Sequence, residues 1–71
     1  KKKRNDLALA DITRAIELNP KYTNAYTMRG AIYFDTKKYD LSKADMEMVL
    51  KLSPNNKFAT DLLARISSLP K

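Results

Sequence analysis

The side chains that could perform chemistry are few in this chain of 71 residues, and their types exclude most catalytic mechanisms. The chain contains no His and no Cys, which removes the commonest general base, the usual zinc ligands and any disulfide. A single Gly leaves no glycine-rich loop that could cradle a phosphate. Among the carboxylates, Asp11, Glu17, Glu47 and Asp61 lie beside Lys or Arg at helical spacing, which is typical of surface ion pairs. We therefore expect no enzyme activity, no bound metal and no cofactor.

The net charge of +6 is concentrated at one end of the chain. Residues 1–4 are all basic, whereas residues 5–71 carry ten basic and eight acidic side chains. Such a cluster can be a nuclear-import or nucleic-acid-binding patch, or it can be a solvated surface segment. No basic stripe follows the helical spacing of the rest of the chain, so the sequence argues against a nucleic-acid partner.

Length and hydropathy describe one small soluble domain with no membrane segment. The longest apolar runs, residues 7–10 and 31–34, have four residues each, whereas a membrane span needs about 20. Residues 1–3 are not followed by a continuous apolar stretch, so we expect no secretory signal and take the cytoplasm as the default location. The chain lacks an initiating Met, and we expect it to be a processed chain or an excerpt from a longer one.

Helical spacing of apolar residues predicts an all-α fold, and no segment shows the alternation of a strand. Each of the three prolines follows an apolar-periodic stretch, where it is expected to end a helix. The predicted helices span roughly residues 6–18, 23–36, 40–52 and 56–68. Asp6 and Asp40 are expected to cap the first and third helices, and Asn55 or Asn56 the fourth.

The chain repeats itself with an offset of 34 residues. Residues 1–20 placed over residues 35–54 give seven identities: Lys3 with Lys37, Asp6 with Asp40, Leu7 with Leu41, Ala10 with Ala44, Asp11 with Asp45, Leu18 with Leu52, and Pro20 with Pro54. A period of this length signals stacked structural repeats, each burying one face on its neighbour. Under the same offset residues 1–5 match residues 35–39, the link between two helices, so the basic cluster is expected to form a solvated loop.

The central repeat has a recognisable motif. It reads Tyr26-x2-Arg29-Gly30-x2-Tyr33, then Ser42-x3-Met46, then Pro54. This pattern resembles the tetratricopeptide-repeat consensus W-x2-L-G-x2-Y…A-x3-F…P. The resemblance covers residues 1–71 as a single segment: the second helix of a preceding repeat (1–20), a full repeat (21–54), and the first helix of a following repeat or a capping helix (55–71). It implies antiparallel helix hairpins stacked as a right-handed α-solenoid.

Three residues of the motif carry packing expectations. Gly inside a helix costs about 0.5–1 kcal/mol relative to Ala, so Gly30 is expected where two helices approach closely. Arg29 replaces the Leu of the consensus and is expected to lay its stem along the core with its charge outward. Ser42 replaces the small Ala at the close-contact position.

The resemblance also implies a protein-binding groove. In tetratricopeptide arrays the first helix of each hairpin lines a concave surface that holds an extended or helical peptide. The matching positions, together with Leu62, are Asn24, Thr27, Met28, Ala31, Phe34, Asp35, Phe58, Asp61 and Arg65. These residues are candidate contacts for a protein or peptide partner, and the alternative is that they simply face solvent or form a cap. Relatives that grip a chaperone's terminal carboxylate use Lys, Asn and Arg there, and Thr27, Met28 and Ala31 do not supply such a clamp.

A structural self-association module is the alternative function. Apolar residues at both ends of the stack, among them Leu9, Ile12 and Ile16, are expected to lack a covering helix and to stack on a second copy. An outer face of the third helix is a further candidate for a homo-oligomer contact, and its residues are Leu41, Ala44, Met48 and Lys51.

Overall fold

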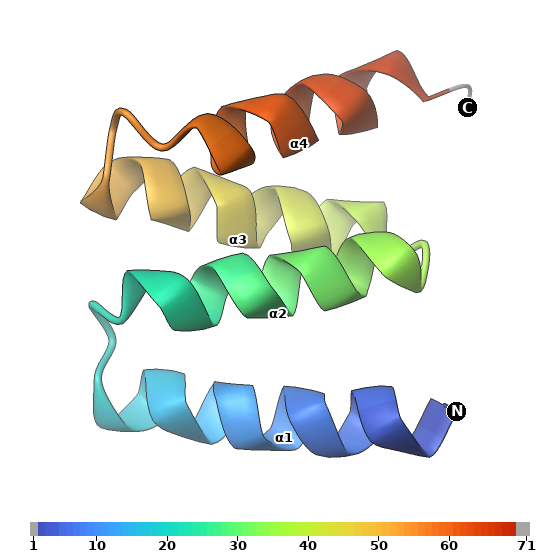
Figure 1. The fold of residues 1–71 in the computed structure, drawn as a ribbon, viewed down its shortest axis with the longest axis vertical. Helices are drawn as coiled ribbons and strands as arrows, with labels where there is room; N and C mark the ends of the chain where they lie inside the picture. The colour runs from blue at the N-terminus through green and yellow to red at the C-terminus, as the bar shows by residue number, and fades with distance from the viewer. Residues whose placement is uncertain (1, 70–71) are drawn as a thin grey trace.

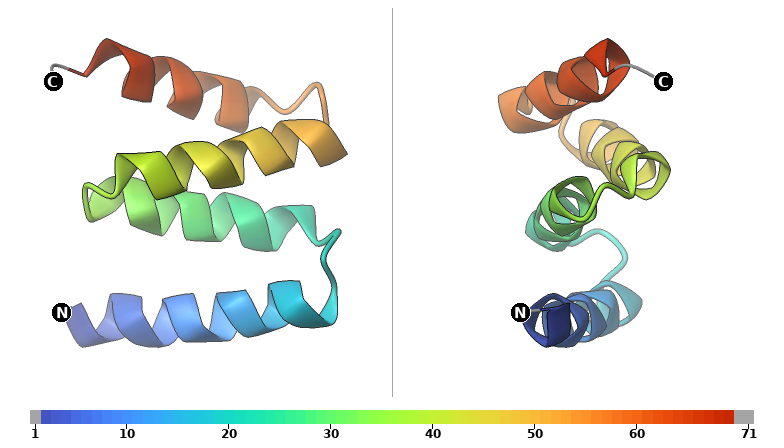
Figure 2. Two further views of the ribbon diagram at one scale, coloured as in Figure 1. Left: turned by 180° about the vertical axis from the view of Figure 1, so that it is seen from behind. Right: turned by 90° about the vertical axis from the view of Figure 1, so that its right-hand side faces the viewer.

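The structure, a computed structural model, describes residues 2–69 and forms four helices within that range. They are α1 (Lys2–Leu18), α2 (Thr23–Asp35), α3 (Tyr39–Leu52) and α4 (Lys57–Ser68). Successive helices run in opposite directions and stack in chain order, as Figures 1 and 2 show. Each helix packs on its neighbours in the chain, and the stack measures 30 × 29 × 15 Å. The all-α fold of stacked helix hairpins is therefore confirmed, and residues 2–69 contain no strand.

The first helix begins earlier than predicted. The sequence predicted a solvated loop before residue 6, but α1 already begins at Lys2. Lys and Arg are good helix formers, and no Gly or Pro interrupts residues 2–6, so the helix extends through the basic cluster. The loop prediction is wrong for residues 2–5, and Asp6 lies inside α1 and does not cap it. Lys1 lies outside the described residues.

The turns between the later helices are closed by local hydrogen bonds. Asn56 caps α4, because its Oδ1 accepts a hydrogen bond of 2.9 Å from the Ala59 amide. Asp40 does not cap α3, which begins one residue earlier; it lies in the first turn, where a negative charge still favours the helix dipole. The turn after α2 places Lys37 at a φ of 66°, with its amide donating to the Phe34 carbonyl (3.1 Å). This is a left-handed helix end in which glycine is usual.

All four helices contribute to one hydrophobic core. Its buried members are Ile12, Ile16, Ala25, Tyr26, Met46, Val49, Ala59 and Leu62. The prediction that Ile12 and Ile16 lack a cover is wrong, since they are only 7% and 9% exposed. They lie one helical turn apart on the face that α1 turns toward the core. The large apolar residues that α1 does leave in solvent are Leu7 (68% exposed) and Leu18 (82%).

Close approach between α2 and α3 centres on Gly30, as its place in the motif predicted. A Cβ atom at Gly30 would collide with Met46 Cε and would lie 3.2 Å from Asp45 Cβ. Ser42 is fully buried, and its hydroxyl donates a 2.8 Å hydrogen bond to the Gly30 carbonyl. Because Gly30 has no side chain, the backbones of α2 and α3 lie close enough for the Ser42 hydroxyl on α3 to bind the Gly30 carbonyl on α2.

Arg29 differs from its sequence-based expectation, because its charge points into the helix stack. Its guanidinium binds both carboxylate oxygens of Asp45 (2.9 and 2.8 Å) and donates a longer bond to Thr13 Oγ1 (3.4 Å). The guanidinium carbon also lies 5.7 Å from the ring centroid of Tyr26 and 5.9 Å from that of Tyr33. Hydrogen bonding to Asp45 raises the pKa of Arg29, although burial opposes this shift. The side chain thus connects α1, α2 and α3.

Candidate functional site

The candidate groove lies between α2 and α4, which face the same side of the stack. Figure 2 (right) shows these two helices displaced to one side, with α3 set back between them. The chain reverses direction between α2 and α3 and again between α3 and α4, so α2 and α4 run in the same direction (Figure 1). Side chains that recur every three or four residues along both helices therefore line a common surface.

Six of the nine predicted groove residues surround one hollow of about 400 Å³. Its lining comes from the end of α2 and the first three turns of α4: Ala31, Phe34, Asp35, Phe58, Asp61, Leu62 and Arg65. The volume suits one or two amino-acid side chains, and it lies within the usual range of ligand pockets. Phe58 is 46% exposed at this hollow, so an aromatic surface is accessible to a partner.

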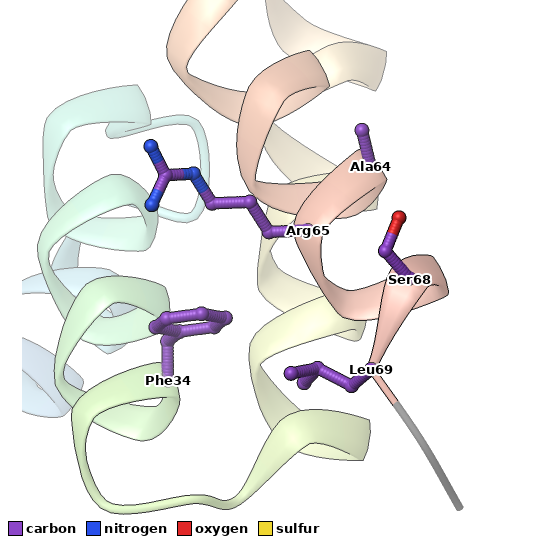
Figure 3. A pocket seen from close by; sticks show the side chains of 5 residues that line it. All are labelled: Phe34, Ala64, Arg65, Ser68 and Leu69. Carbon is purple, nitrogen blue, oxygen red and sulfur yellow. The ribbon is translucent and has the colours of Figure 1, made fainter.

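A second hollow of about 400 Å³ adjoins the first toward the end of α4. Figure 3 shows its lining residues Phe34, Ala64, Arg65, Ser68 and Leu69, with Phe34 and Arg65 reaching toward each other from opposite helices. Because these two residues also line the first hollow, the hollows form one continuous groove. Ala64, Ser68 and Leu69 are not among the groove residues predicted from the sequence. The spacing of Arg65 and Ser68 places them on one face of α4, and this signal could have identified the extension.

The position of Phe34 is fixed from behind by an aromatic contact. Its ring meets Tyr39 edge-to-face, with centroids 5.4 Å apart and planes inclined at 70°. Tyr39 is the first residue of α3, so the turn that joins α2 to α3 also supports the groove. Aromatic pairs of this geometry contribute about 0.5–1.5 kcal/mol beyond their buried area. The contact with Tyr39 therefore helps to hold the Phe34 ring in its place in the candidate groove.

The remaining predicted residues lie in the first half of α2, outside both hollows. Asn24 and Met28 are exposed, the latter by 53%, and Thr27 donates its hydroxyl to the Thr23 carbonyl at 3.1 Å. The structure therefore groups Ala31, Phe34 and Asp35 with α4, and leaves the earlier three on an open helix surface.

The charges at the groove are not paired with each other. The ion pair that the spacing of Asp61 and Arg65 allows is not formed, and the one salt bridge among the described side chains is Arg29–Asp45. No group of three or more potential metal ligands occurs among the described residues. The candidate groove therefore presents apolar side chains beside charged side chains that form no salt bridge among the described residues.

A stack of antiparallel helices with a 34-residue period, whose first helices line one side, defines a helical-repeat protein. None of the helices among residues 2–69 has the length and apolar character to cross a membrane. The family model of the tetratricopeptide repeat matches residues 23–56, and the chain belongs to that family. The predicted division at residues 20 and 54 into a full repeat and flanking helices stays a prediction.

Known proteins with a similar sequence are much longer than this chain. The chain is 46% identical over 61 residues to RNA polymerase II-associated protein 3 of Homo sapiens, an alignment that covers 86% of the chain. It is 37% identical over 57 residues to Hsp70-Hsp90 organizing protein of Triticum aestivum (80% of the chain). It is 44% identical over 52 residues to serine/threonine-protein phosphatase 5 of Rattus norvegicus (73% of the chain). The chain spans only 9–10% of the length of these relatives, and the repeat is a protein-interaction module without catalytic chemistry of its own.

Proposed function

We propose that this chain is a protein-interaction scaffold that binds a peptide or helical segment of a partner in the groove between α2 and α4. The two adjoining hollows, lined largely by residues that the family resemblance had implied as groove positions, carry this proposal. Fully burying an exposed Phe contributes about 1.5–3 kcal/mol, so covering the exposed half of Phe58 contributes about 0.7–1.5 kcal/mol to binding.

The experiment is a selection of random dodecapeptides displayed on phage against the chain, followed by mapping of the strongest binder through backbone amide shifts. The expected shifts concentrate at the end of α2 and along α4. Phe58→Ala should weaken binding about tenfold, equivalent to about 1.4 kcal/mol. The matched control is Leu41→Ala, which removes a side chain of similar exposure (48%, against 46% for Phe58) that lines neither hollow. Equal losses in the two variants would contradict the proposed groove.

The name of the wheat relative connects that protein with two chaperones. A grip on a terminal carboxylate needs several Lys, Asn or Arg side chains, and Met28 and Ala31 supply none of them. Arg65 is the one basic residue that lines either hollow. We therefore propose a protein segment as the partner without assigning it to the carboxylate end of a chaperone.

Self-association is a second candidate because α1 leaves Leu7 and Leu18 in solvent. The 34-residue offset shows how α4 of one copy would meet α1 of another, as α2 meets α3. Leu63 would then occupy the place of Arg29 opposite Asp11, so this stack would lack the salt bridge of the internal one. Sedimentation over a hundredfold concentration range tests the candidate, since self-stacking predicts a mass and a melting temperature that rise with concentration.

A further inference from the structure

The two hollows of the groove differ in charge, and the difference specifies what a partner must carry. Two carboxylates line the first hollow, Asp35 at the end of α2 and Asp61 near the start of α4, and they outnumber its one cation, Arg65. Neither carboxylate takes part in a salt bridge among the described side chains. A partner that covers them removes their water, which is unfavourable unless it supplies a positive charge.

The second hollow has the opposite character. It contains no carboxylate, and its polar groups are the Arg65 guanidinium and the Ser68 hydroxyl. Figure 3 shows the Arg65 side chain extended across the groove toward α2, beside the ring of Phe34. An arginine presents five N–H donors and no acceptor, so it favours a carboxylate or carbonyl oxygen from a partner.

We propose that the groove selects a peptide segment with an apolar anchor flanked by Lys or Arg at the first hollow and by an acidic side chain at the second. This inference rests on the proposed function and gives its partner a charge pattern and a direction. The cation lies between Asp35 and Asp61, the anchor fills the space beside Phe34 and Phe58, and the acidic group meets Arg65.

The net charge of +6 on the whole chain does not reverse this preference. Four of the charges belong to residues 1–4 of the sequence, and neither hollow includes a residue of α1. At physiological salt, exposed charges more than about 8 Å apart are largely screened, so the side chains at the groove dominate recognition. An acidic tail or a nucleic-acid strand would place negative groups against both aspartates.

The peptides selected in the display experiment test the inference by their composition. We expect groove binders to be enriched in Lys or Arg next to an aliphatic or aromatic residue. The consensus peptide, synthesised and titrated, should bind Asp35→Asn/Asp61→Asn about 3- to 10-fold more weakly, because each partly exposed pair contributes a factor of about 1.5–5. Arg65→Gln should weaken peptides that carry the acidic group and leave those without it unchanged. Glu47→Gln, an exposed change on α3, is the matched control and should bind normally.

Two other results overturn the inference in distinguishable ways. Groove-binding peptides that are acidic throughout, or that bind Asp35→Asn/Asp61→Asn as tightly as the original chain, refute the charge pattern and leave the scaffold function intact. If the selected peptides shift backbone amides of this chain away from α2 and α4, the proposed function and the charge pattern are refuted together. Melting curves of each variant show whether a loss of binding reflects unfolding.

Discussion

Replacing Asp45 by Asn removes the charge from the most specific contact between the helices. The Asp45 side chain is 6% exposed and accepts two hydrogen bonds, of 2.9 and 2.8 Å, from Arg29. Asparagine keeps the shape but offers one acceptor oxygen, and its NH2 group faces the NH groups of the guanidinium. One charge-assisted hydrogen bond is lost, and the cation is left partly buried without its counter-charge.

The size of the effect follows from how deeply each partner is buried. Breaking a fully buried pair typically destabilises a protein by about 3–5 kcal/mol. Arg29 is 19% exposed and lies against two tyrosine rings, so it stays partly solvated, and we expect a loss of about 2–3 kcal/mol. For a chain of this size that corresponds to a fall of roughly 10–20 °C in melting temperature.

Urea unfolding followed by circular dichroism at low temperature measures this loss. Glu47→Gln, an exposed change on the same helix, should stay within about 0.5 kcal/mol of the original chain. In a double-mutant cycle, Arg29→Met with Asp45→Asn should be less destabilised than the sum of the single changes by about 1–3 kcal/mol. If Asp45→Asn alone changes stability by less than about 0.5 kcal/mol, or if the two changes add, the pair does not hold the helices together as argued.

The same contact should make no difference to the pH dependence of stability near neutrality. The pKa of Arg29 is raised in the folded chain, chiefly by hydrogen bonding to Asp45. A raised folded-state pKa means that the contribution is complete below the ordinary arginine pKa and is lost only as the pH rises through the folded value. Deprotonation of Arg29 is therefore expected to remove this contribution in strongly alkaline solution and not near neutrality, which pH-dependent melting can check.

Four further substitutions test the packing and the helix ends. Gly30→Leu should destabilise the chain by about 1–3 kcal/mol or more through overpacking against α3, and an unchanged melting temperature would disprove the close approach. Ser42→Ala should lower stability by about 0.5–1.5 kcal/mol because a buried hydrogen bond disappears; a stabilised variant in the same urea assay would show that the bond contributes nothing net. Lys37→Gly should raise the melting temperature by relieving a left-handed backbone that disfavours side chains by about 1–2 kcal/mol, and a lower value would contradict that turn geometry. Asn56→Ala should reduce stability by about 0.5–2 kcal/mol, seen as earlier loss of α4 signals in NMR melting, whereas simultaneous melting of all helices at the original temperature would argue against the cap.

Local signals in the sequence predicted the features that depend on neighbouring residues. Gly30 was identifiable because glycine is unfavourable in a helix unless close packing requires it. The cap of α4 was narrowed to Asn55 or Asn56 because amide side chains cap helix starts, and the structure selects Asn56. Phe34 and Arg65 were identifiable from the resemblance to tetratricopeptide repeats, which implies that the first helix of each hairpin lines the groove. What helical spacing could not provide is the part that Leu69 takes in the second hollow, because Leu69 lies just beyond the end of α4.

Features that depend on distant residues were missed or wrong. The Arg29–Asp45 pair joins residues 16 positions apart, and the motif gave no reason to couple them. The 34-residue offset makes Asp11 and Asp45 equivalent, yet Asp11 is exposed and Asp45 is 4% exposed, because only Asp45 has a neighbouring first helix on that side among the described residues. The offset also led to the loop prediction at residues 2–5, since it compares positions and not the helix propensity of their side chains.

The polar contacts described above are unevenly distributed, and this has a consequence for motion at the groove. Arg29 and Ser42 connect the first three helices through side-chain hydrogen bonds, whereas the side-chain hydrogen bonds made by residues 56–60 stay within the start of α4. Among the described side chains, α4 is therefore held to the stack by apolar packing alone. Elements with fewer specific ties open at lower free energy, so backbone amides of α4 should exchange with solvent faster than those of α3. The wall of the candidate groove that α4 forms is therefore expected to shift more readily than the wall that α2 forms, so the width of the groove should vary in solution.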